Sequence, residues 1–160
     1  MMREDARFED AGARPLNLGA READDVQVIS ALVQDAVLTG ADISWQPARR
    51  RLSLLINRFR WEDRDAAETG RRPYERVRAL LVIDGVTGVA SQGIDRKDGS
   101  AILSLLSLAW LPGKDAEGRL ELTLAGDGAI AANVEYLELT LKDVTRPYRA
   151  PSGHVPHHPE

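Results

Sequence analysis

The stretch RLSLLINRFRW at residues 51–61 alternates apolar and polar side chains with the period of a β-strand. Its first apolar residues share one face of that strand and are Leu52, Leu54 and Ile56. Its later apolar residues share the opposite face and are Leu55, Phe59 and Trp61. Because neighbouring side chains on a flat strand point to opposite faces, this change of face predicts a β-bulge or a strong twist near Asn57.

Further strand-like runs follow this stretch. Residues 62–74 are charged and predict a surface loop. Residues 77–83 alternate again, and the pair Asp84-Gly85 predicts a tight hairpin whose return strand starts at Val86 and runs to about residue 94. These residues therefore indicate antiparallel neighbours joined by a short turn.

The last third of the chain has the same character. Residues 120–124 alternate cleanly, and the sequence Gly126-Asp127-Gly128 predicts a turn rather than a phosphate-binding loop. The final run at residues 130–141 changes its apolar face near Tyr136, which predicts a second bulge.

Residues 101–111 are nearly all apolar, which leaves two structures open. One is a strand that is buried on both faces, and the other is a buried helix capped by Ser100. The segment suits the interior or the face of a dimer. A second copy of the chain is therefore one candidate partner.

One helix is predicted upstream, where residues 23–33 place apolar side chains at helical spacing. Asp24 or Asp25 lies at its start, where a carboxylate interacts favourably with the helix dipole, and it should end near residues 34–35. Its expected buried side consists of Val26, Ile29 and Val33. Residues 15–18 predict a short first strand, and residues 36–45 predict a strand that bends at Gly40.

These elements predict an α+β fold with a mainly antiparallel, strongly bent sheet or partly closed barrel of about seven strands and one N-terminal helix. The helix is expected to cover an open end or edge of the sheet. We expect one globular domain at residues 15–148, a charged N-terminal arm at residues 1–14, and a disordered tail rich in proline and histidine at residues 149–160.

The composition excludes several classes of site. The chain has 160 residues, a net charge of −4 and no cysteine, so thiolate metal sites, iron–sulfur clusters and a cysteine nucleophile are excluded. The histidines are confined to the predicted tail and are His154, His157 and His158. We therefore expect no metal site and no cofactor, and no enzyme mechanism that uses a histidine base. No apolar run approaches the roughly 20 residues that span a bilayer, and we expect a soluble cytoplasmic protein.

Two arginines form the main candidate site. Arg58 and Arg60 alternate with Phe59 and Trp61, so the guanidinium groups should point together to the face opposite the aromatic rings. With Glu62 beside them, they suit an anion or carboxylate ligand in a polar cavity. The favoured expectation, however, is an open surface on which the two arginines pair with acids of a neighbouring strand.

A second basic run, Arg49-Arg50-Arg51, offers two interpretations. With Trp45 it could contact RNA, but the acidic net charge favours a solvated turn. We therefore expect no nucleic-acid partner.

Three segments carry a family resemblance, and they are residues 23–34, residues 57–62 and residues 126–130. Together they resemble a family of alphaproteobacterial proteins with a domain of unknown function, over residues 15–144 of this chain. The resemblance implies a single bacterial domain and supplies no activity or site residues.

The favoured function is a non-enzymatic cytoplasmic binding or interaction domain, because no catalytic motif stands out. The alternative is a small-anion-binding protein or an enzyme that uses Arg58 and Arg60.

Overall fold

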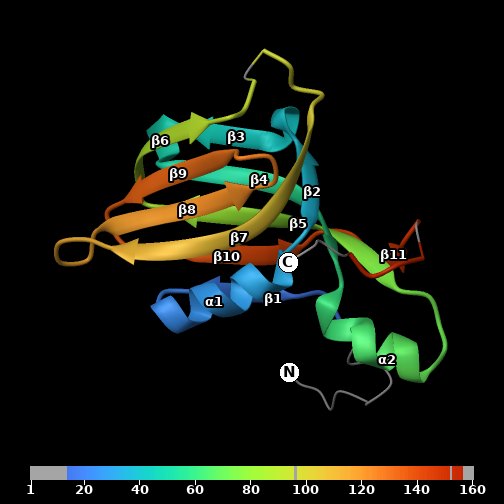
Figure 1. Cartoon of the computed structure of the whole chain (residues 1–160). Coiled ribbons are helices and arrows are strands. Elements are labelled where there is room, and N and C mark those ends of the chain that lie inside the picture. Colours follow the sequence, from blue (N-terminus) through green and yellow to red (C-terminus); the bar gives the residue numbers. More distant parts are fainter. Residues whose placement is uncertain (1–13, 96, 152, 157–160) are drawn as a thin grey trace.

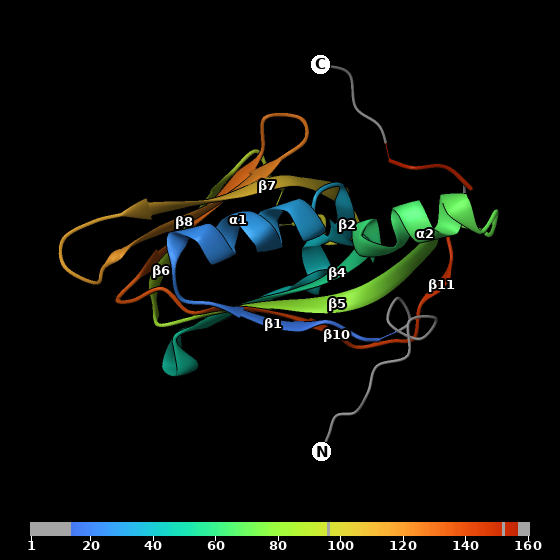
Figure 2. The ribbon, with the colours of Figure 1, turned by 90° about the horizontal axis from the view of Figure 1, so that it is seen from below.

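The computed structural model describes residues 14–95, 97–151 and 153–156, and it is built mainly of antiparallel strands (Figures 1 and 2). The strands and α-helices are, in chain order, β1 (Asn17–Ala20), α1 (Ala23–Leu32), β2 (Ala36–Thr39), β3 (Ile43–Gln46), β4 (Arg51–Phe59), α2 (Arg64–Thr69), β5 (Glu75–Asp84), β6 (Val86–Gln92), β7 (Ile102–Pro112), β8 (Gly118–Leu124), β9 (Ala129–Val134), β10 (Leu139–Asp143) and β11 (Tyr148–Arg149). Short 3₁₀ helices lie at Gly40–Asp42, Pro47–Arg49 and Trp61–Asp63.

All strands of the described residues belong to one 11-stranded sheet. Its main path runs β1-β10-β5-β4-β2-β7-β8-β9-β6, while β3 pairs with β4 and β11 pairs with β5. The sheet curves around an apolar core and is not closed, as the sequence predicts (Figure 1). The predicted number of strands is too low, because the chain breaks into short strands at Gly40 and after Val134. A second helix, α2, lies in the segment that was expected to be a loop.

The predicted hairpin at Asp84-Gly85 is wrong. Antiparallel ladders join β5 to β4 along one edge and to β10 along the other, so no edge of β5 is left for β6. Gly85 does turn the chain, with a φ of 71° that favours glycine. After that turn β6 pairs with β9.

No bulge lies at either predicted place, Asn57 or Tyr136, and the strong twist that was the other option near Asn57 stays a prediction. The β4–β5 register is continuous from Arg51 to Phe59, and the apolar side chain on the far face, Phe59, is buried because it packs against Trp61 and Tyr74 beyond the strand. The change of face near Tyr136 marks the crossing from β9 to β10, which pair with different strands. Register shifts occur instead at residues 86–88 and 105–107.

The segment at residues 101–111 forms the strand β7, and the buried helix is excluded. The strand is not buried on both faces, since only Leu105 and Leu108 are fully buried in it. Its edge beyond Leu105 faces α1, where the Ser30 Oγ accepts a hydrogen bond from the Leu108 amide at 2.9 Å. In Figure 2 α1 lies between β7 and β1, so the helix covers an opening of the sheet.

The predicted helix face is confirmed. Val26 and Ile29 of α1 are buried, as is Val33 directly after it, and the helix ends at Leu32. Two aspartates lie in its first turn, although the N-cap residue is Glu22 and makes no side-chain capping bond. The helix therefore depends on packing more than on capping.

The two ends of the chain are only partly described. The predicted arm at residues 1–14 lies outside the described residues except for Arg14, as do His157 and His158 of the predicted tail. Ala150 is buried and its amide donates to the Tyr74 carbonyl at 2.8 Å, so the packed body includes this residue. Neither α1 nor α2 has the length and apolar character of a membrane-crossing helix.

We predict that Ile29→Ala lowers the free energy of unfolding by about 2–5 kcal/mol, because the substitution removes a fully buried side chain between helix and sheet. Chemical denaturation measures the change. The matched control is Val28→Ala in the same helix, where the side chain is 55% exposed and the effect should stay within about 0.5 kcal/mol. Equal effects of the two substitutions would contradict the assigned helix face.

Candidate functional site

The arginine pair at the end of β4 lies inside the protein. Arg58 shares the inner face of β4 with Leu54 and Ile56 and is 0% exposed, and Arg60, just after the strand, is 2% exposed. The expectation of an open surface is therefore wrong. Burial of two guanidinium groups is costly unless acids pair with them, and one partner of Arg58, Asp143, lies 85 residues away in the chain.

Every N–H group of Arg58 has an acceptor. Its Nε and Nη2 donate to the two carboxylate oxygens of Asp143 at 3.0 and 2.9 Å. Its Nη1 and Nη2 donate to the two oxygens of Glu62 at 2.9 and 2.8 Å, and Nη1 also reaches the Phe59 carbonyl at 3.4 Å. Such two-pronged pairs are the strongest geometry for arginine and carboxylate. Asp143 also accepts the Leu16 amide at 2.8 Å, so the cluster links β4 and β10 to the start of β1.

Arg60 is less completely paired. Its Nη1 donates to Glu75 and lies 3.6 Å from Asp63, whose carboxylate is held by both Nη groups of Arg72 at 2.6 and 2.7 Å. The Nε of Arg60 lies 3.7 Å from Glu62, too far for a hydrogen bond. Its Nε and Nη2 are buried and have no hydrogen-bond partner among the described residues. One edge of this guanidinium group is thus unsatisfied.

The charges of this cluster perturb each other. Burial alone would lower the pKa of Arg58, but its hydrogen bonds to Glu62 and Asp143 outweigh burial and raise that pKa. Burial alone would raise the pKa of Glu62, but the hydrogen bonds from Arg58 outweigh it and hold that pKa below its ordinary value. Glu62 is therefore ionised at neutral pH. The structure brings the three residues of the predicted site together, and it adds Asp143, which no sequence pattern linked to them.

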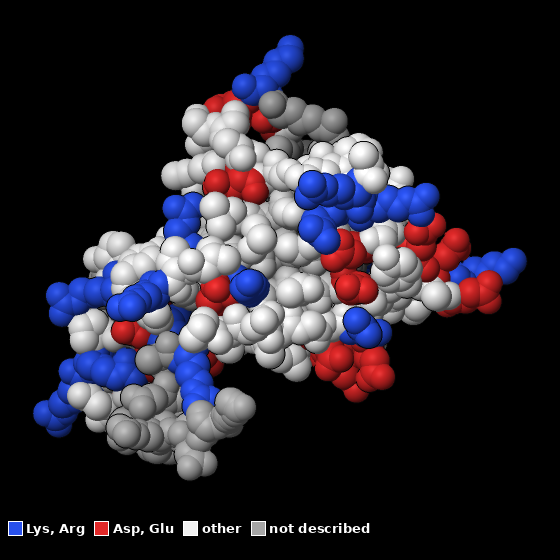
Figure 3. Space-filling view, turned by 180° about the vertical axis from the view of Figure 1, so that it is seen from behind, with Lys and Arg blue, Asp and Glu red and all other residues white. Residues whose placement is uncertain are grey.

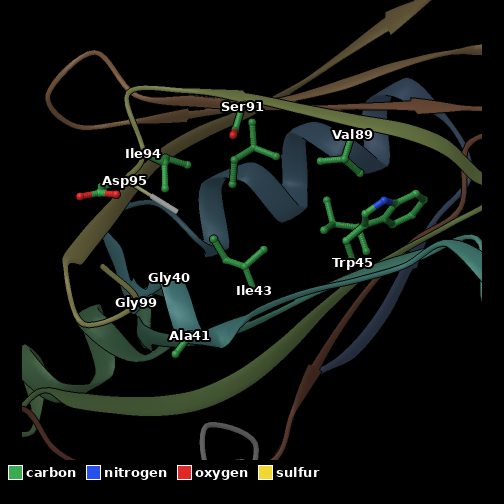
Figure 4. Close-up of a pocket in the computed structure, with 11 residues that line it drawn as sticks. Gly40, Ala41, Ile43, Trp45, Val89, Ser91, Ile94, Asp95 and Gly99 are labelled. Carbon is green, nitrogen blue, oxygen red and sulfur yellow. The ribbon is translucent and has the colours of Figure 1, made fainter. Parts of the chain in front are cut away.

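A second feature is a cavity of about 500 Å³ between β3 and β6 (Figure 4). Ile43 and Trp45 of β3 face Val89 and Ser91 of β6 across it. The remaining lining residues are Leu52 of β4, Ile130 of β9, and Gly40, Ala41, Ile94, Asp95 and Gly99 from the connecting segments. Most of the wall is therefore aliphatic or aromatic.

Backbone hydrogen bonds connect the segments on the two sides of this cavity near its ends. At one end the Val86 amide donates to the Arg50 carbonyl at 2.9 Å. At the other end the Ala41 amide donates to the Gly99 carbonyl at 3.0 Å, where Gly40 lies so close that a Cβ on it would be 3.4 Å from the Gly99 Cα. Between these points no β3–β6 pairing occurs among the described residues, since β3 pairs with β4 and β6 pairs with β9. The cavity thus lies along two unpaired strand edges.

Three of the predicted RNA-contact residues make other contacts in the structure. Trp45 lines the cavity, while the Nη1 of Arg50 lies 2.5 Å from Glu135 and the Nε of Arg51 lies 2.8 Å from Asp84. Both acidic and basic side chains lie on the face shown in Figure 3, among many uncharged residues. Within the described part of the chain, no group of His, Asp and Glu side chains has the arrangement of a metal site.

Comparison with known proteins gives one match. A family model described as "Protein of unknown function (DUF2948)" matches residues 16–158, which is most of the chain. The chain belongs to the DUF2948 family. The predicted resemblance to a family with a domain of unknown function is thereby confirmed, while the alphaproteobacterial origin stays a prediction. No curated protein and no solved structure matches this DUF2948 domain.

We predict that Arg58→Ala lowers the free energy of unfolding by about 3–5 kcal/mol, because it leaves the carboxylate of Asp143 buried without its cation. Chemical denaturation measures the change. The control is Arg51→Ala, which removes a partly exposed salt bridge to Asp84. It should lower the free energy of unfolding by no more than about 1 kcal/mol.

A double variant separates lost charge from lost packing. Arg58→Met with Asp143→Asn removes both charges, and the asparagine keeps an oxygen that can accept the Leu16 amide. It should be more stable than Arg58→Met alone. A double variant that is less stable than the single one would show that the ion pair is not the cause.

Proposed function

We propose that this DUF2948 domain binds a small, largely apolar molecule in the cavity between β3 and β6. The observation that carries the proposal is the cavity itself. Its volume of about 500 Å³ lies within the range of roughly 300–1,000 Å³ that is usual for ligand pockets, and its lining is mostly apolar. This refines the sequence-based expectation of a non-enzymatic binding domain, and the cytoplasmic and bacterial setting stays part of the proposal.

A compact ligand fits the cavity better than an extended peptide. A peptide that adds to a free strand edge needs room to run along it. Here hydrogen bonds from Val86 to Arg50 and from Ala41 to Gly99 join the segments that flank β3 to the start of β6 and to the loop after it. Both contacts would have to break for a strand to pass through.

The unpaired stretch between these contacts supplies the entrance. No hydrogen-bond ladder links β3 and β6 in the described part of the chain, so small separations of the two strands break no sheet pairing. Ligand entry through this stretch leaves the β3–β4 and β6–β9 ladders intact.

We predict that the neutral fluorescent probe N-phenyl-naphthylamine binds with one molecule per chain and that Val89→Phe weakens binding about tenfold or more, because the larger ring fills the cavity. Fluorescence titration measures both. The matched control is Ala90→Phe, which places the same ring on the exposed face of the same strand and should leave affinity unchanged. Absence of probe binding, or equal weakening by both substitutions, would contradict the proposal.

A second candidate function rests on the unsatisfied edge of Arg60. The Nε and Nη2 of a guanidinium group together suit a carboxylate or another small anion. The proposed anion site comprises Arg58, Arg60 and Glu62. The cluster already contains three guanidinium groups and four carboxylates, namely Arg58, Arg60, Arg72, Glu62, Asp63, Glu75 and Asp143. An anion therefore enters by displacing Glu62, which is partly exposed and lies next to both Arg58 and Arg60.

We predict that acetate, at ionic strength held constant with chloride, raises the melting temperature of the wild type, because an anion that binds only the folded state stabilises it. Glu62→Gln should increase the rise by removing the competing charge. Arg60→Lys should abolish it, since lysine lacks the planar pair of donors. An equal rise in all three proteins, or none in any, would remove this candidate.

A further inference from the structure

One face of the sheet is turned away from the apolar core over β4, β5 and β10. We infer that this outer face binds a second copy of the chain, with the strands of the two copies running in opposite directions. The outer face is a different surface from β7, which the sequence suggests as a dimer contact. The inference is also independent of the proposed ligand, because the cavity lies on the inner side of β3.

The middle of the outer face is uncharged. The inner side chains of these strands are buried, among them Leu54, Leu81 and Leu141, so the residues between them point outward. The outward residues in the middle are Ser53 and Leu55 of β4, Leu80 and Val82 of β5, and Thr140 of β10, and all are partly exposed. Figure 3 shows the molecule from behind, the side on which β4 and β5 lie in Figure 1, and many uncharged residues are visible on it.

The α-helices pack elsewhere in the part of the chain that the structure describes. The main contacts of α1 are with β7 and β1, and those of α2 are with the 3₁₀ helix at Trp61–Asp63. A Cβ added to Gly19, which pairs with Thr140, would meet no atom within 4 Å. The aliphatic side chains of Leu55, Leu80 and Val82 are therefore left partly open to solvent. An apolar centre with a charged rim is typical of a protein–protein contact.

Charges of opposite sign lie at the two ends of the outer face. One end carries the carboxylates of Asp84, the last residue of β5, and Glu138, just before β10. These two residues are neighbours, since the Asp84 amide donates to the Glu138 carbonyl at 3.0 Å. Arg51 pairs with Asp84, which leaves an excess of negative charge at this end. The other end carries the exposed cations Arg78 and Lys142.

This separation of charge makes the outer face complementary to itself. In a symmetric dimer the same surface of each copy forms the contact, so a twofold axis across the strands places each end over the opposite end of the second copy. On β5 such an axis passes at Leu81, midway between Asp84 and Arg78, and brings these two residues together. Copies with strands in the same direction would instead place Arg78 over Arg78, which is unfavourable.

The charges on β10 require the same axis. Glu138 and Lys142 are centred on Thr140, so rotation about that residue places each over the other in the second copy. Leu81, the centre on β5, pairs with Leu141, which is the next residue after Thr140. The two centres thus agree within one residue, and one rotation matches both pairs of charges.

The size of the outer face indicates a weak dimer. The neighbouring strands β1, β10, β5, β4 and β3 lie about 4.8 Å apart, and the charged ends are about 20 Å apart along β5. The face therefore covers roughly 500 Å² on each chain, or roughly 1,000 Å² in the dimer. This is at the low end of specific interfaces, where association is transient.

Sedimentation equilibrium of the full chain, between about 1 and 200 µM, measures the association. We expect a monomer–dimer equilibrium with a Kd in the micromolar range. The Kd should rise with salt, because exposed charges at the rim are screened. A full chain that stays monomeric throughout this range overturns the inference.

An exchange of charges assigns the dimer to the outer face. Residues 138 and 142 are about 13 Å apart along the chain, too far to form an ion pair within one copy. Glu138→Lys and Lys142→Glu should each raise the Kd about three- to tenfold, because each places like charges together twice in the dimer. The double variant restores opposite charges between the copies and should return the Kd to within about twofold of the wild type.

The matched control is Lys114→Glu in the loop between β7 and β8. It makes the same change of charge at an exposed position away from the outer face, and it should leave the Kd unchanged. Melting temperatures check that every variant is folded. Equal weakening by Lys114→Glu and Lys142→Glu, no weakening by either single exchange, or no recovery in the double variant overturns the inference.

Discussion

In this fold β5 forms antiparallel ladders with β4 along one edge and with β10 along the other. After the turn at Gly85 the chain therefore finds no free edge of β5 to pair with. Instead β6 pairs with β9 on the far side of the core. The curved sheet is left with two openings. The helix α1 covers the one between β1 and β7, with Ser30 capping the Leu108 amide. The other lies between β3 and β6, and the cavity occupies it. The proposed binding site thus exists because β4 and β10 occupy both edges of β5, so that β6 pairs elsewhere and leaves a gap beside β3.

The arginine cluster connects β4 to β10 and to the start of β1 from the inner face of β4. Charges are costly to bury, and a buried ion pair contributes little to stability when compared with apolar residues of similar size. Its contribution is specificity, since Arg58 is satisfied only if β4, β10 and the segment after β4 are correctly placed around it. The hydrogen bonds from Arg58 outweigh burial and keep the pKa of Glu62 below its ordinary value, so Glu62 is ionised at neutral pH. Arg60 is the exception, because one edge of its guanidinium group is left without a partner among the described residues.

The sequence predicts local features well and the partners of each strand poorly. Alternation in residues 51–59 and 120–124 identifies strands, and helical spacing identifies the buried side of α1, because these patterns depend on the residues themselves. The Asp84-Gly85 pair predicts a turn correctly and a hairpin wrongly, since strand pairing depends on which edges other segments already occupy. Arg58, Arg60 and Glu62 can be grouped from the sequence because they are close in it, and the structure places their side chains near one another. Asp143 and the cavity were not found, because both require contacts between residues far apart in the chain.

The proposed ligand enters between β3 and β6, and the three tryptophans of the chain report on its binding separately. Trp45 lines the cavity, Trp61 donates its indole N–H to the Gln34 carbonyl, and Trp110 packs over Gly118 at the end of β7. Nuclear magnetic resonance resolves the three indole N–H signals during a titration with N-phenyl-naphthylamine. We expect the Trp45 signal to shift in proportion to occupancy while those of Trp61 and Trp110 stay in place. A shift of Trp61 or Trp110 without Trp45, or no shift of any signal at saturating probe, would contradict the account.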